Sequence, residues 1–228
     1  MLTLHILLTQ LHKRMKPLAF QNLTKIKLIF MIAVCWMTSS ATFAADYATV
    51  LMYHRFGESK YPSTNIRIEQ FKAHLNMLGN GNYNVWPLGK IVDHLQQGLN
   101  LPDKTVAITI DDAYLSVFTE ARPRLAAYNF PYTVFVATQP VDRGQRGYMS
   151  WDQIRTLQDE GVQIGSQTRS HPHMHKISLI DAENELKISN ARFLEEIGQR
   201  PKLFAYPYGE YNLDIIELVK QAGFDSAF

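Results

Sequence analysis

The sequence predicts an α/β fold in which short strands alternate with helices. Several short apolar runs, each ended by polar or turn residues, have the length and composition of buried strands. Between them lie segments whose apolar residues recur at spacings of three and four, which is the period of an amphipathic helix. With 46% hydrophobic and 19% charged residues, the 228-residue chain can bury one full core. The composition therefore favours a one-domain α/β protein.

The elements of the first half follow in order. An apolar strand precedes His54, a helix comes next, and residues 83–86 form a second strand. A helix after Leu88 leads to the strand 106–110. Residues 118–128 suggest a helix that Pro123 starts or kinks, because proline lacks the backbone N–H, and a strand is expected over 132–137. The buried face of the first helix is marked by Ile68, Phe71, Leu75 and Leu78.

The second half continues the alternation. A helix over 151–160, ended by Gly161, precedes a strand over 162–166. Ser178 and Asp181 resemble a capping box for a long helix that Gly198 ends. A strand over 203–205 then leads to a last helix capped by Asn212, and the final strand is expected over 224–228. No repeat or linker divides residues 46–228, which we interpret as one domain.

The first 45 residues predict a secretory signal peptide. They contain basic residues and no acid, then ten unbroken apolar residues over 28–37, then small residues that lead to Ala44. Translation from Met15 would give a more ordinary signal. Ten apolar residues are few for a bilayer span, so a stable membrane anchor is the less favoured alternative. The pattern predicts a periplasmic or secreted protein.

Charge and cysteine content limit the compartment and the classes of binding partner that the sequence allows. The lone cysteine, Cys35, lies in the predicted signal, so the domain needs no disulfide in an oxidising compartment. The same segment holds five of the 23 basic residues and none of the 21 acidic ones, which leaves residues 46–228 net negative. No basic stripe remains for nucleic acid. A neutral or cationic polymer fits better, and the sequence does not indicate an oligomeric state.

Two consecutive acids, Asp111 and Asp112, end the apolar strand 106–110. Adjacent carboxylates repel each other and neither favours a strand. At the carboxyl end of a barrel strand, one can hold a metal while the other moves a proton. The alternative is an acidic turn in which Asp112 caps the next helix.

Three of the eight histidines follow the strand 162–166 within five residues, at His171, His173 and His175. Imidazole is the commonest metal ligand in proteins, so this cluster and the strand-end carboxylate favour a mixed nitrogen and oxygen site for a Zn-like ion. A solvated histidine-rich loop is the alternative. His54, Gln167 and the segment 206–208 also follow predicted strands, and in a barrel such positions share one face.

The chain resembles the polysaccharide deacetylase family, the NodB-homology enzymes of carbohydrate esterase family 4. Residues 108–114 (ITIDDAY) resemble the family's Thr-Phe-Asp-Asp-Gly motif, 167–171 (QTRSH) its His-Thr-x-Ser-His motif, and 204–209 (FAYPYG) its Phe-Arg-x-Pro-Tyr-Gly motif. The segment 50–56 is similar to the permuted exopolysaccharide (poly-N-acetylglucosamine) deacetylases, in which a first-strand histidine replaces a carboxyl-terminal one. The resemblance covers about residues 48–228.

This resemblance implies an incomplete (β/α) barrel and a metal-dependent hydrolase that removes N-acetyl groups from an N-acetylglucosamine-containing envelope or extracellular polysaccharide and releases acetate. Asp111 would be the catalytic base and His54 the acid. Asp112, His171 and Gln167 would hold a divalent metal, expected to be Zn²⁺ with Co²⁺, Ni²⁺ or Fe²⁺ as alternatives. His175 is the alternative third ligand. Sugar contacts are expected from Tyr206, Pro207, Tyr208, Tyr114 and Trp151, with barrel packing as the alternative for the aromatic rings.

Three departures from the family pattern matter. Gln167 stands where the first metal histidine is usual, and a neutral amide oxygen is a weaker ligand. Ala205 replaces the arginine that commonly pairs with the base. The chain stops at Phe228, inside a predicted strand, so a carboxyl-terminally truncated barrel is expected. A non-catalytic glycan-binding protein is therefore the second reading. A phosphoryl-transfer enzyme ranks last, because no glycine-rich phosphate loop is present.

Overall fold

The computed structural model describes residues 44–228. Most of the predicted signal segment, residues 1–43, lies outside the described residues. Its last two residues form β1 (Ala44–Ala45), which pairs with β6 (Leu101–Pro102) in a short antiparallel ladder. Among the helices of residues 44–228, none is both long and apolar enough to cross a lipid bilayer.

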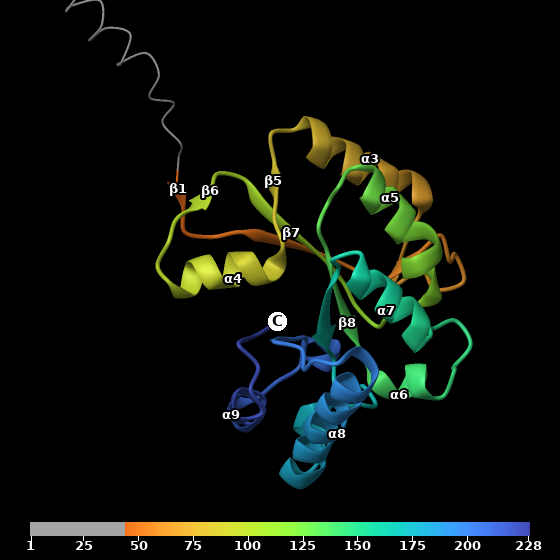
Figure 1. Ribbon diagram of the computed structural model, residues 1–228, viewed down its shortest axis with the longest axis vertical. Coiled ribbons are helices and arrows are strands. Elements are labelled where there is room, and N and C mark those ends of the chain that lie inside the picture. The colour runs from red at the N-terminus through yellow and green to blue at the C-terminus, as the bar shows by residue number, and fades with distance from the viewer. Residues whose placement is uncertain (1–43) are drawn as a thin grey trace, which may run out of the picture. The chain divides into compact units, whose positions relative to one another are not determined.

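A curled parallel sheet lies at the centre of the fold (Figure 1). Its strands lie in the order β11-β10-β9-β8-β7-β2, and β5 pairs with the beginning of β7. All its ladders are parallel, so the carboxyl ends of the strands meet at one edge, as they do in a half barrel. The strands are β2 (Thr49–Tyr53), β5 (Asn84–Val85), β7 (Thr105–Ile110), β8 (Thr133–Val136), β9 (Gln163–Ser166), β10 (Leu203–Phe204) and β11 (Ser226–Ala227).

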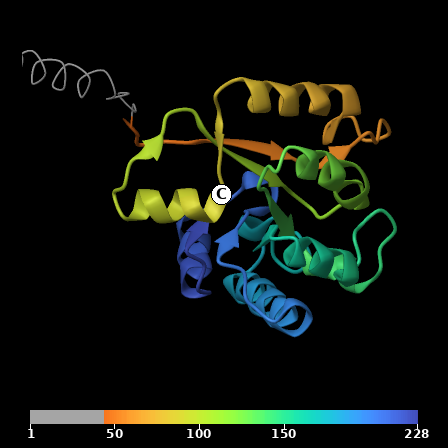
Figure 2. The ribbon, with the colours of Figure 1, turned by 45° about the horizontal axis from the view of Figure 1, so that its top comes forward.

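Helices surround this sheet, and both ribbon views show them at the periphery with the strands inside (Figures 1 and 2). They follow the predicted apolar periods closely. The helices are α3 (Ile68–Asn80), α4 (Leu88–Gln96), α5 (Arg122–Ala127), α6 (Thr138–Asp142), α7 (Trp151–Asp159), α8 (Leu179–Ile197) and α9 (Leu213–Gln221). Ser178 accepts a hydrogen bond from the backbone N–H of Asp181, and Gly198 ends α8 with a left-handed backbone, which confirms both predicted ends of that helix.

The pleat of β7 divides its side chains between two apolar clusters. Val106, Ile108 and Ile110 pack outward against the helices, in a cluster that includes residues of α3, α5 and α7. Ala107 faces inward, into a cluster that includes residues of α4. β8 repeats the pattern, with Phe135 on the inner side. Side chains alternate along a strand, so the residues that follow each strand inherit an inward or outward direction.

Some elements differ from the sequence-based expectation. The helix expected over 118–128 is divided into a π-helical turn, Val117–Ala121, and α5, and Pro123 lies in the first turn of α5, where its missing N–H costs no hydrogen bond. The ladder of β3 (Arg55–Phe56) with β4 (Asn65–Ile66) and the short helix α6 were not predicted. Each is too short to carry a periodic signal.

Candidate active site at the carboxyl ends of the strands

A cavity of about 800 Å³ opens at the carboxyl ends of the strands. Its wall is built by the inward residues of the pleat, continued past the last residue of each strand. Five strands and the segments after them contribute in this way. The inward residues are Val50, Met52 and His54 from β2, Thr109 and Asp111 from β7, Phe135 and Ala137 from β8, Gln167 from β9 and Ala205 from β10.

Asp111 lies deep in this cavity, and only 7% of its surface is exposed. Its backbone N–H donates to the carbonyl of Tyr53, which continues the β2 to β7 ladder. Burial, and then the neighbouring charge of Asp112, raise the pKa of the Asp111 carboxyl to about 7. Its Oδ2 is 4.0 Å from Nε2 of His54, and burial lowers the pKa of that imidazole. The structure thus brings the predicted base and acid together.

Asp112 and His171 form the second pair. Oδ1 of Asp112 and Nε2 of His171 are 3.4 Å apart, and both residues line the cavity. Two ligands on one tetrahedral Zn²⁺ at about 2.0–2.1 Å lie about 3.3 Å from each other, so the spacing fits two positions of a metal site. Burial lowers the pKa of His171, which favours the neutral, ligating imidazole. Within residues 44–228, however, no three acidic, cysteine or histidine side chains group closely enough to form a metal site.

The backbone at this pair is strained. Asp112 and Ala113 have φ of 73° and 54°, and Thr168 and His171 have φ of 70° and 59°, a left-handed region that side chains disfavour. Two hydrogen bonds hold the second of these turns: the hydroxyl of Thr168 accepts from the backbone N–H of His171, and Ser189 in α8 donates to the carbonyl of Thr168. The surrounding fold therefore fixes the direction of His171.

Gln167 is 1% exposed and lies between the two acids. Its Oε1 accepts a hydrogen bond of 3.2 Å from the backbone N–H of Asp112. Its Nε2 lies 3.5 Å from Oδ2 of Asp111. The sequence predicts that this amide oxygen points at a metal, and that role stays a prediction. In the structure the oxygen already has a protein donor.

His175 does not join Asp112 and His171. Its Nδ1 is 3.4 Å from Oε2 of Glu210, and the same oxygen accepts from Nδ1 of His173 at 2.5 Å. Glu210 follows the predicted 206–208 segment, and sequence reasoning missed it because no strand immediately precedes it. The histidine cluster is thus divided, with His171 at the cavity and the other two at Glu210.

The predicted sugar contacts also divide. Tyr206, Tyr208 and Tyr114 line the cavity. Tyr208 is the exposed one, at 58%, and its ring stacks on His173 with centroids 4.0 Å apart. Trp151 is buried at the start of α7, packs edge-on against Phe193 and donates its indole N–H to Asp142. It therefore packs within the barrel, which was the alternative to a sugar contact. Pro207 is also buried and lies outside the cavity lining.

Tyr114 is held by residues that the sequence analysis did not single out. Burial, and then its interactions with Asp112 and Tyr148, raise the pKa of its hydroxyl. The Arg55 guanidinium lies 3.3 Å from the centre of the Tyr114 ring and pairs with Glu58 at 2.8 Å. Tyr148 lies in a loop, its ring centroid is 4.9 Å from that of Tyr114, and the two backbones meet in an isolated antiparallel bridge. No local pattern in the sequence marks such a contact.

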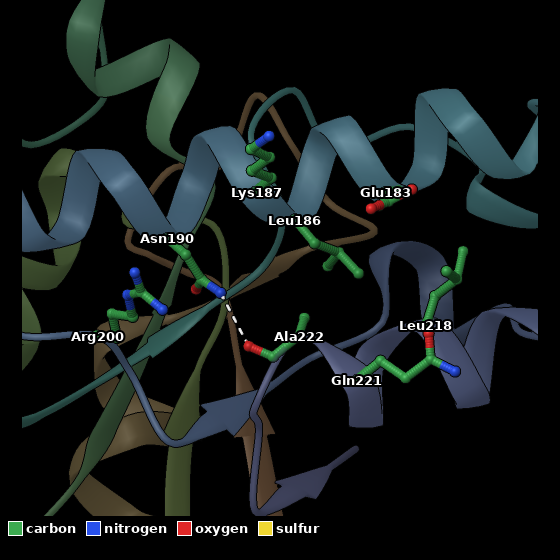
Figure 3. Close-up of a pocket in the computed structure, with 8 residues that line it drawn as sticks. All are labelled: Glu183, Leu186, Lys187, Asn190, Arg200, Leu218, Gln221 and Ala222. Carbon is green, nitrogen blue, oxygen red and sulfur yellow. Dashed lines mark hydrogen bonds between the residues drawn. The ribbon is translucent and has the colours of Figure 1, made fainter.

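A second cavity, of about 310 Å³, lies between α8 and α9 and shares no residue with the first (Figure 3). There Asn190 donates to the carbonyl of Ala222 at 3.2 Å, which ties α8 to the end of α9. Leu186 and Leu218 extend toward each other across the groove, while the charged groups of Lys187 and Arg200 lie at its rim. We interpret this groove as part of the helix packing.

Comparison with known proteins agrees with this geometry. The family model for polysaccharide deacetylase matches residues 98–227. The Bacillus subtilis (strain 168) protein YxkH, whose name places it among the polysaccharide deacetylases, is 24% identical over 77% of this chain. The chain spans 61% of that relative's length. A poly-β-1,6-N-acetyl-D-glucosamine N-deacetylase of Staphylococcus aureus (strain MRSA252) is 23% identical over 81% of this chain and 67% of its own length.

Solved structures share the fold. IcaB from Ammonifex degensii superposes with a TM-score of 0.71 at 28% identity, covering 79% of this chain and 82% of that one. The Streptococcus pyogenes deacetylase PplD, solved in complex with acetate, gives a TM-score of 0.72 at 20% identity, over 78% of this chain and 81% of its own. The second likeness is one of fold alone.

Proposed function

The chain belongs to the polysaccharide deacetylase family, and we propose that it removes N-acetyl groups from an N-acetylglucosamine-containing glycan and releases acetate. The single observation that carries this proposal is the strand-end constellation. Asp111 faces His54 across 4.0 Å, and Asp112 faces His171 across 3.4 Å, in one cavity of about 800 Å³. A proton-transfer pair beside a metal-ligand pair suits metal-assisted amide hydrolysis.

Each residue of the constellation has a role in this proposal. Asp111 accepts the proton of the attacking water, and its pKa of about 7 suits proton transfer near neutral pH. His54, whose Nε2 lies 4.0 Å from Oδ2 of Asp111, gives a proton to the departing sugar amine. As the family resemblance implies, the backbone N–H of Tyr208 would donate to the oxyanion that develops on the acetyl group.

We also propose metal dependence, which the Asp112 and His171 spacing supports. These two residues would hold a divalent ion, with Zn²⁺ the expected one and Gln167 the third ligand if its oxygen turns toward the ion. Bound there, the ion would act as a Lewis acid and lower the pKa of a water molecule. Because only two strong ligands from residues 44–228 meet at this point, weak metal binding is expected.

The proposed substrate is a β-linked poly-N-acetylglucosamine. The printed name of the Staphylococcus aureus relative supports this choice, as does the open cavity with Tyr208 exposed at its wall. A glycan of the cell envelope or exterior also agrees with the predicted signal in residues 1–45. We therefore propose that the protein acts in the periplasm or outside the cell.

An acetate-release assay tests the proposal. Purified protein supplied with Zn²⁺ or Co²⁺ is expected to release acetate from β-1,6- and β-1,4-linked N-acetylglucosamine oligomers, and a chelator should stop the release. Cooperative thermal unfolding must be shown first, so that an unfolded sample is not read as an inactive one. A folded, metal-loaded protein that releases no acetate but still binds the oligomers would replace the enzyme with the glycan-binding alternative.

A further inference from the structure

We infer that Gln167 positions the base Asp111 through its amide nitrogen, in place of its expected role as a metal ligand. The inference rests on the proposed function and concerns the same cavity. It starts from one observation: a single buried amide contacts both consecutive acids, one through each of its two polar atoms.

The amide contacts are specific in direction. Asp112 offers a backbone N–H, which only the amide oxygen can accept, at 3.2 Å. Asp111 offers a carboxylate oxygen, which only the amide nitrogen can approach as a donor, at 3.5 Å. The reverse orientation of the amide would place donor against donor and oxygen against carboxylate. The surroundings therefore fix the amide in one orientation.

Backbone hydrogen bonds hold both residues of this contact in place. The N–H of Gln167 donates to the carbonyl of Val136 at 2.9 Å, so the residue continues the β8 to β9 ladder. Asp112 has a left-handed φ of 73°, and its N–H is the one that meets the amide oxygen. Gln167 thus ties the end of β9 to the strained turn after β7.

Asp111 needs such a partner. A carboxylate this deeply buried is costly unless donors satisfy it. Among the ion pairs of residues 44–228, that with His54, at 4.0 Å, is the one that reaches Asp111. Ala205, at the position where the family resemblance places an arginine, is buried in the wall of the same cavity and brings no donor. The Gln167 amide supplies the nearest side-chain N–H, without a full charge.

The two roles of Gln167 make opposite predictions for two substitutions. Gln167→Met keeps the length and removes both polar atoms. Gln167→Glu keeps an acceptor for the Asp112 N–H, loses the donor to Asp111, and supplies an anionic oxygen that is a better metal ligand than an amide. If Gln167 is a metal ligand, the Gln167→Met variant should bind the metal more weakly and the Gln167→Glu variant should keep its activity. A positioning role predicts unchanged metal binding for Met and low activity for both.

The matched control is Gln163, at the other end of β9. Its Oε1 accepts from the backbone N–H of Gly89 at 3.0 Å and from the hydroxyl of Thr133 at 3.1 Å, and it lies outside the cavity lining. Gln163→Met removes a similarly bonded amide from the same strand. It should lower stability while leaving the turnover of the folded protein unchanged.

The experiment measures Zn²⁺ affinity by titration calorimetry and acetate release at saturating Zn²⁺ for the wild type and the three variants. We expect Gln167→Met to bind Zn²⁺ within about threefold of the wild type, and kcat of both Gln167 variants to fall about tenfold or more with KM little changed, the size expected for a neighbour that orients a reacting group. A tenfold loss of Zn²⁺ affinity in Gln167→Met, or wild-type kcat in Gln167→Glu, would overturn the inference. If the wild type itself releases no acetate, the proposed function fails, and the Zn²⁺ affinity of Gln167→Met alone decides the role of Gln167.

Discussion

At the scale of a single residue, burial beside Asp112 disfavours the charged form of Asp111. The pKa of its carboxyl is therefore raised to about 7, close to neutral pH. The sequence alone predicted both acids at a strand end, and the pleat explains why Asp111 points into the cavity. The pKa shift and the amide contact of Gln167 could not be predicted, because they depend on side chains from another strand.

The Asp111→Asn substitution should abolish turnover and stabilise the metal-free protein. The folded carboxyl has a pKa of about 7 against an ordinary value of 3.8, so the folded state keeps a proton that the unfolded chain has lost. Stability contributed by this group therefore falls as the pH rises from about 4 to about 7. Asparagine does not ionise, so its advantage should grow to at most about 4 kcal/mol above pH 7. Thermal unfolding at pH 4 and pH 8 measures this, and an equal difference at both values would contradict it.

A Tyr114→Phe substitution should weaken metal binding, because it removes a hydroxyl that interacts with Asp112. Partners of this kind typically contribute about 10- to 100-fold to affinity or activity. The control is Tyr132→Phe, whose hydroxyl is buried without a hydrogen-bond partner in the described structure. Calorimetric Zn²⁺ titration should show at least a tenfold loss for the first variant and no change for the second. Equal affinities would show that Tyr114 only packs.

At the scale of elements, length decides what could be predicted. α8 carries an apolar period over five turns and has recognisable residues at both ends, so its bounds follow from the sequence. β7 is a six-residue buried run, and it too is predictable. The pairing of β3 with β4 and the bridge between Tyr114 and Tyr148 involve only a few residues each, and they form because larger elements bring them together.

Packing between neighbouring strands gives a test at this scale. Gly165 in β9 faces the ring of Phe135 in β8, and an added Cβ would lie well inside contact distance of that fully buried ring. Gly165→Ala should destabilise the protein by about 1–3 kcal/mol through overpacking. Gly79→Ala, in α3 against the half-exposed Tyr128, should be neutral or stabilising because alanine favours a helix. Chemical denaturation measures both, and equal effects would contradict the packing account.

At the scale of the whole molecule, parallel strands bring side chains distant in sequence to one cavity. Strand-end residues predicted the wall of that cavity, because one edge of a parallel sheet collects them all. The division of the histidine cluster between the cavity and Glu210 could not be predicted, since adjacent loop residues take directions that only local backbone geometry sets.

A metal held between β7 and β9 should stabilise the fold. Asp112 follows β7 and His171 follows β9, so a bound ion would link the two strand ends. Zn²⁺ at about 100 times its Kd should raise the free energy of unfolding by about 2.7 kcal/mol. Thermal shift with and without Zn²⁺ measures this, and the shift should vanish in His171→Ala and persist in His175→Ala. The reverse result would move the site to His175.

Acetate release measured together with bound Zn²⁺, on the wild type and Asp111→Asn with an N-acetylglucosamine oligomer, tests the central claim most directly. The wild type should release acetate in proportion to bound Zn²⁺, up to one ion per chain. Asp111→Asn should bind Zn²⁺ as well as the wild type does. Its rate of acetate release should be lower by roughly 100-fold or more, because it lacks only the base. Acetate release that is independent of Zn²⁺, or equal in the two proteins, would contradict a deacetylase site built on Asp111, Asp112 and His171.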